Sequence, residues 1–118
     1  MPFVDLTDHP EVELAPGVRA RTPHGERIML SRLELDAESL VPTHHHPHEQ
    51  AGILLEGDLE LTIGNETRLC KTGDMFIIPG GVPHCARPVN GPALVLDVFS
   101  PPREDYAELS NRYIPVWE

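Results

Sequence analysis

A dense cluster of histidines is the part of this sequence with the clearest chemical meaning. Four of the seven histidines fall within five positions, namely His44, His45, His46 and His48. Imidazole nitrogens are ligands that divalent transition metals accept in proteins. The cluster therefore predicts a site for one divalent transition-metal ion, with zinc, nickel, manganese and iron as the alternatives.

The spacing of these residues selects a set of metal ligands. Side chains of an extended chain alternate between two faces, so His44 and His46 point the same way and Gln50 can join them. A second region of the chain normally supplies a further ligand, and His84, which follows a proline, is the candidate. We predict that His44, His46, Gln50 and His84 bind the ion. His48 shares their face, and its role stays open between a fifth ligand, a group that supports a ligand and a substrate contact.

A second group of candidate residues lies near the end of the chain. Asp97 stands in the middle of an otherwise apolar segment, where a carboxylate is costly unless it is used or paired. Asp97 and Phe99 share one face of a strand, and Arg103 follows a rigid Pro-Pro turn that could direct it toward the same site. Each also has a structural interpretation: Asp97 as an ion-pair partner of Arg103 or Arg87, Phe99 as a core residue, and Arg103 on the surface of the last turn.

The elements that must position these residues follow the two-residue period of β-strands. Alternation is clear in residues 27–36 and 58–63, and Gly64-Asn65 then predicts a hairpin turn into residues 67–71. Short apolar runs at 75–78 and 93–99 end at Pro-Gly and Pro-Pro and predict buried strands. Residues 103–113 alone could form a helix, started by Pro102. The pattern predicts an all-β fold with a short C-terminal turn or helix.

Composition narrows the classes of function. The chain has 118 residues and a net charge of −10, which suits a single domain over residues 1–118 and argues against nucleic acid or a membrane surface as partner. Cys70 and Cys85 form neither a zinc knuckle nor a Cys-x-x-Cys motif, and Cys85 should point away from the metal because it alternates with His84. With no membrane span or signal peptide by pattern, we expect a cytoplasmic protein. Surplus apolar positions, at Val4, Val12, Leu14 and the outer face of residues 93–98, predict a homodimer.

Two motifs carry a family resemblance. His44-x-His46-x3-Gln50-x6-Gly57 and Gly73-x5-Pro79-x-Gly81-x2-His84 resemble the two signature motifs of the cupin superfamily. The resemblance implies a small single-domain cupin β-barrel, also called a double-stranded β-helix or jelly roll, with two antiparallel sheets and a core over roughly residues 27–100. The family's usual Glu ligand is replaced by Gln50, which leaves the full charge on the metal and strengthens it as a Lewis acid. The Asn that often ends the second motif is Pro88.

A narrower resemblance concerns activity. The segment from Asp97 to Tyr106, read together with the histidine motif, resembles the KdgF-type cupins of pectin degradation, which linearise unsaturated uronates. It implies a sugar acid as substrate, Asp97 as acid/base, Phe99 as an aromatic contact and Arg103 as the group that binds the substrate carboxylate. An Fe(II)-type cupin dioxygenase and a non-catalytic metal- or sugar-binding cupin are the alternatives.

Overall fold

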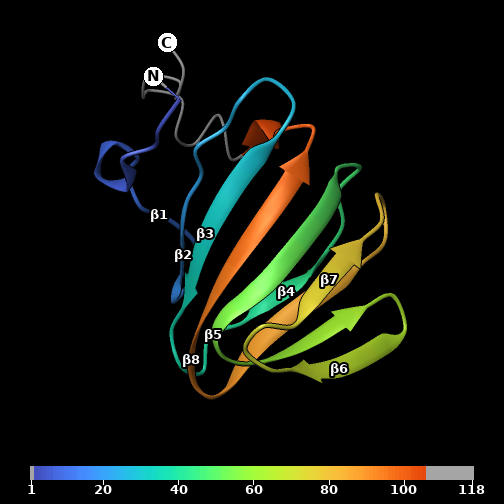
Figure 1. The fold of residues 1–118 in the computed structure, drawn as a ribbon. Coiled ribbons are helices and arrows are strands. Elements are labelled where there is room, and N and C mark those ends of the chain that lie inside the picture. The colour runs from blue at the N-terminus through green and yellow to red at the C-terminus, as the bar shows by residue number, and fades with distance from the viewer. Residues whose placement is uncertain (1, 106–118) are drawn as a thin grey trace.

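Two long strands organise the fold, β5 (Glu49–Ile63) and β8 (His84–Ser100). They pair antiparallel along their whole length, from Glu49 opposite Ser100 to Ile63 opposite His84. β3 lies against the second half of β8 and β4 against its first half, while β7 and β6 lie against the corresponding halves of β5 (Figure 1). Each half of the long pair is thus widened by its own neighbours.

The computed structural model describes residues 2–105. Its remaining elements are a 3-10 helix η1 (Leu6–Asp8) and the strands β1 (Val12–Ala15), β2 (Val18–Arg21), β3 (Met29–Leu35), β4 (Val41–His44), β6 (Glu66–Cys70) and β7 (Met75–Ile78). Most of the helix predicted for residues 103–113 lies outside the described residues. Among the described residues, no helix is long and apolar enough to cross a bilayer.

The long pair bends in the middle, which brings its two halves around one core. Gly57 has φ +90°, and a Cβ there would overlap the carbonyl oxygen of Pro92 on the facing strand, so a side chain is excluded. The register shifts on both sides of Glu56: β5 has one extra residue between Leu54 and Glu56, and β8 has the extra residues opposite the step from Glu56 to Asp58. Leu54 and Val95 from one half and Leu59 from the other consequently belong to the same buried cluster.

The prediction of an all-β fold is confirmed, but the prediction of two separate sheets is wrong. Strands β1-β2-β3-β8-β5-β6 follow one another in a single eight-stranded antiparallel sheet, with β4 paired to β8 and β7 to β5, and this sheet is not closed. The reason is that β5 and β8 run through both halves without a break. Gly57, Asn90 and Gly91 have positive φ angles, which are typical of turns and predict that a strand ends. Here the strands bend at these residues and continue.

Two further strand predictions have different outcomes. The hairpin between β5 and β6 forms around Gly64 as predicted, with Ile63 opposite Glu66. The run 75–78 is the strand β7, but only its inner face is buried: Ile78 is 1% exposed, whereas Met75 and Ile77 are 77% and 66% exposed. β7 pairs with β5, and nothing among the described residues packs on the outer face of β7. The predicted homodimer remains a prediction.

Candidate metal centre

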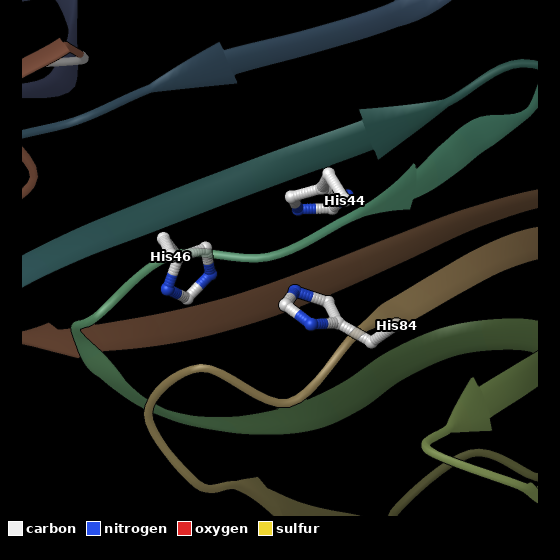
Figure 2. Close-up of side chains that lie close together, drawn as sticks. All are labelled: His44, His46 and His84. Carbon is white, nitrogen blue, oxygen red and sulfur yellow. The ribbon is translucent and has the colours of Figure 1, made fainter.

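Three histidines from separate segments come together at one end of the β4–β8 pair. His44 ends β4 and His84 begins β8, and the two residues are opposite each other in register. His46 lies in the short loop between β4 and β5. The ring centroid of His84 is 4.3 Å from that of His44 and 4.9 Å from that of His46, and all three rings face a common space (Figure 2). The structure thus unites three of the four predicted ligands.

The alternation that selected these residues continues through a loop. Residues 45–48 are not in a strand, yet His46, His48 and Gln50 are buried, whereas His45, Pro47 and Glu49 are exposed. The inward side chains therefore keep the two-residue period although the hydrogen-bonded ladder is interrupted. Gln50, the fourth predicted ligand, begins the inner face of β5 and is 6% exposed.

Backbone carbonyls orient all three imidazoles in the same manner. Nδ1 of His44 donates to the carbonyl of Pro42 at 2.7 Å, and Nδ1 of His84 donates to the carbonyl of Val82 at 2.8 Å. Nδ1 of His46 donates to the carbonyl of His48 at 3.1 Å. A neutral imidazole has a single N–H, so each Nε2 is left with its lone pair. Such outer hydrogen bonds fix the tautomer of metal-binding histidines.

The lone pairs of these rings have the arrangement that a metal ion needs. One ligand atom from each of His44, His46 and His84 lies within 4.8 Å of the others, so the three fit within about 2.8 Å of one point, close to the coordination distance of about 2.0–2.2 Å. Nε2 of His84 is buried and has no hydrogen-bond partner among the described residues. Burial lowers the pKa of His84 to about 4 and also lowers the pKa of His46, so both rings are neutral at pH 7. The three histidines could hold a metal ion.

Gln50 connects this cluster to Asp97. Its Oε1 lies 3.1 Å from Nε2 of His46, and its side chain also hydrogen-bonds Asp97. Since Nδ1 of His46 carries the proton, the Gln50 contact places two acceptor atoms side by side. Two ligands of one cation lie about 3 Å apart when they bind it at a right angle. This contact between two acceptors therefore fits a shared ion, with the amide N–H of Gln50 free to donate to Asp97.

Asp97 is a buried carboxyl on the inner face of β8. It lies opposite Gly52 of β5, and a Cβ at Gly52 would approach Oδ1 of Asp97 to 2.7 Å and would overlap the ring of Phe76. Glycine is thus required for both side chains to occupy this space. Burial raises the pKa of Asp97 to about 7, against the opposing effects of the hydrogen bond from Gln50 and the charge of Arg103. Oδ1 has no hydrogen-bond partner among the described residues.

Phe99 and Arg103 form the neighbouring wall. The Phe99 ring contacts His46 edge-on, with centroids 5.6 Å apart, and the Arg103 guanidinium lies 5.2 Å from the Phe99 centroid. Nε and Nη2 of Arg103 donate to the two carboxylate oxygens of Asp105, at 3.1 and 2.6 Å. Both Phe99 and Arg103 are buried, so the surface position considered for Arg103 is wrong. The other arginine considered as a partner of Asp97, Arg87, pairs instead with Glu60.

One cavity of about 380 Å³ joins these groups. Its polar border includes His44, Gln50, His84, Asp97, Arg103 and Asp105, and the rest of its lining is mainly apolar. Cys85, predicted to point away from the ligands, is half-buried and also borders the cavity. Neither Cys85 nor Cys70 is in a disulfide.

Residues 31–99 match the family model described as "Cupin domain". The chain belongs to the cupin family. The cupin is 26% identical over 106 residues to the pectin degradation protein KdgF of Dickeya dadantii, an alignment that covers 88% of this chain and 96% of that protein. The structure of KdgF from Halomonas sp. superposes with a TM-score of 0.82 at 28% identity, over 90% of this chain and 98% of that one.

An RmlC-like cupin from Shewanella frigidimarina also superposes with a TM-score of 0.82, at 22% identity, covering 90% of this chain and 96% of that one. That likeness concerns the fold alone. The predicted cupin fold and the resemblance to KdgF are therefore confirmed, whereas the roles of individual site residues stay predictions.

Sequence reasoning missed several groups around this site. His48, whose role the sequence left open, lies outside the three-histidine cluster, and its partner was not foreseen: its Nε2 is 2.9 Å from Oε2 of Glu104. Asp105 pairs with Arg103, and Gly52 makes room for Asp97. The pairings of Glu104 and Asp105 depend on how the chain turns after β8, and the role of Gly52 depends on strand register, so neither follows from spacing. A glycine inside an apolar strand was the one available signal.

Proposed function

We propose that this cupin is a metal-dependent enzyme that opens the ring of an unsaturated uronate during pectin breakdown. The observation that carries the proposal is the placement of Asp97, a buried carboxyl that borders the same cavity as two of the clustered histidines and Arg103. A proton-transferring group is most effective when its pKa lies near the working pH, and in the metal-free protein burial raises the pKa of Asp97 to about 7. The similarity to KdgF over most of both chains supports the choice of substrate.

His44, His46, His84 and Gln50 would hold the ion in this proposal. A divalent metal bound there supplies Lewis acid chemistry toward substrate oxygens. All four ligands are neutral, so none reduces the charge of the ion. The carbonyls of Pro42, His48 and Val82 keep the three imidazoles in the metal-binding tautomer.

The proton steps of the reaction are assigned to Asp97. Ring opening of a cyclic enol hemiacetal breaks the bond between the ring oxygen and the anomeric carbon, and the anomeric hydroxyl loses its proton as the aldehyde forms. The ring oxygen leaves as an enolate, which becomes a ketone when a proton adds to the carbon next to the one that carries this oxygen. Asp97 accepts the first proton as a carboxylate and donates the second as a carboxylic acid, so the enzyme returns to its starting state.

Arg103 and Phe99 bind the substrate in this scheme. The planar guanidinium of arginine matches a carboxylate with two parallel hydrogen bonds. A local cation is needed because the whole chain carries a net charge of −10, which repels a uronate at long range. Phe99 contacts both His46 and Arg103, so it sets the distance between the ligand cluster and the carboxylate site.

Protein purified without a histidine tag and analysed for bound metal provides the test. An unsaturated uronate absorbs ultraviolet light because its double bond is conjugated with the carboxylate, and ring opening to the ketone removes that absorbance. We expect equal rates of loss under air and under nitrogen. A requirement for oxygen would support the dioxygenase alternative, and the absence of turnover in both atmospheres would support a non-catalytic binding protein.

A further inference from the structure

Arg103 lies on a short segment that is held from several sides. It follows Pro101-Pro102 at the end of β8, and its guanidinium is buried against the Phe99 ring. The carboxylate of Asp105 binds Nε and Nη2, which fixes the plane of the guanidinium. An arginine side chain has many rotamers, so a defined orientation has to come from such contacts.

The segment that carries Arg103 is also tied to the loop that carries the histidines. Nε2 of His48 lies 2.9 Å from Oε2 of Glu104, and His48 is 5% exposed. An acceptor is needed there, because a buried N–H without a partner is costly. With the proton on Nε2, the Nδ1 of His48, which has no partner among the described residues, keeps only a lone pair.

In the contact between His48 and Glu104, His48 belongs to the loop that carries the metal-ligand candidates. His48 stands between His46 and Gln50, and its carbonyl accepts the Nδ1 proton of His46. One residue therefore contacts a metal-ligand candidate through its backbone and the Arg103 segment through its side chain. His48 and Glu104 thus link the ligand cluster to the segment that carries Arg103, and Asp105 orients the guanidinium within that segment.

We propose that His48, Glu104 and Asp105 are positioning residues that hold Arg103 at the distance from the ligand cluster that a uronate carboxylate requires. The inference rests on the proposed function, because it assigns the carboxylate to Arg103. The side chains of Glu104 and Asp105 are 79% and 56% exposed, so they add little to the core. Each pair has a buried partner, His48 or Arg103, so removal of the carboxylate also costs stability, and only the comparison of acid with ester separates a positioning role from a structural one.

Glu104→Ala and Asp105→Ala, compared with Glu49→Ala, test the proposal. Glu49 is an exposed carboxylate at the start of β5, directly after the ligand loop, so its removal changes the net charge equally. Each variant is assayed with an unsaturated uronate and with its neutral methyl ester, and its affinity for a saturated hexuronate is measured by calorimetry. The comparison of acid with ester isolates the contribution of the carboxylate.

We expect KM and Kd for the acids to rise about 3- to 10-fold in Glu104→Ala and about 10-fold or more in Asp105→Ala, as lost hydrogen bonds to charged groups predict. The kinetic and binding values for the ester, and kcat for the acid, should stay those of Glu49→Ala. Glu104→Gln keeps an acceptor for His48 and should restore the acid affinity.

Equal acid-to-ester ratios in Glu104→Ala, Asp105→Ala and Glu49→Ala would overturn the positioning role while leaving the ring-opening activity in place. A parent protein that binds acid and ester equally would also overturn it, because Arg103 would then have no carboxylate to hold. A parent protein that prefers the acid but does not turn over the uronate would overturn the proposed reaction and leave the positioning role supported by affinity.

Discussion

Replacing Asp97 with asparagine should lower activity and raise stability at the same time. Asparagine has nearly the shape of the carboxyl and can still accept the hydrogen bond from Gln50, so the fold and the ligand cluster are preserved. It cannot transfer a proton, and turnover of an unsaturated uronate should fall on the order of 10²-fold or more. Affinity for the substrate should change little.

The stability effect follows from the burial of the carboxylate. Its pKa is raised from 3.8 to about 7, so the folded state is favoured when Asp97 is protonated and loses that advantage as the pH rises from 3.8 through 7. The loss is on the order of 1–2 kcal/mol by about pH 5 and 4 kcal/mol by about pH 8. The asparagine side chain does not ionise. The free energy of unfolding of Asp97→Asn, relative to that of the parent, should therefore increase by on the order of 2–3 kcal/mol between these two pH values.

Urea unfolding of the metal-free proteins at both pH values measures this difference, and the absorbance assay measures turnover. Metal-free protein is used because a bound cation would itself stabilise the carboxylate. A stability difference that does not change with pH would show that the carboxyl is not held in a protonated state. Wild-type turnover in Asp97→Asn would refute the proton-transfer role.

Three other outcomes are expected. Metal content by elemental analysis should fall far more in His44→Ala or His84→Ala than in His45→Ala, whose side chain is exposed, and equal content in all three would refute the ligand assignment. Arg103→Lys keeps the charge but loses the bidentate fork, so KM for the uronate should rise by about 10- to 100-fold with kcat little changed, and an unchanged KM would contradict carboxylate binding. Light scattering at micromolar concentration should give the mass of a homodimer, and a monomer would contradict that prediction.

The sequence predicted inward-facing residues better than it predicted strand ends. The two-residue period placed Gln50 and Asp97 on the inner faces of β5 and β8, and it remained valid across the loop after His44. Strand continuity was not predictable, because Gly57 and Asn90-Gly91 have turn conformations yet lie within continuous strands. A local turn signal says that the chain bends, and only long-range pairing decides whether the ladder continues.

Burial and side-chain pairing depend on what the rest of the chain covers. Residues 75–78 read as a buried strand because all four are apolar, but nothing among the described residues covers the outer face of Met75 and Ile77. From the sequence, Arg103 fitted a surface position as well as a substrate-binding one. Its contacts with Phe99 and Asp105 exist because of the path of the chain after β8. Contacts of this kind leave no periodic pattern in the sequence, so they could not be predicted from it.

The glutamine at position 50 is best understood together with Asp97. Its amide has two different ends, and the structure uses both, with Oε1 beside Nε2 of His46 and a hydrogen bond to Asp97. A glutamate there would place a second carboxylate against the buried carboxyl of Asp97, and two adjacent carboxylates cannot both ionise without a large shift in pKa. Glutamine avoids that repulsion and donates a hydrogen bond to the carboxylate form. The departure from the glutamate that is usual in cupins therefore allows Asp97 to change its protonation state next to the ligand cluster.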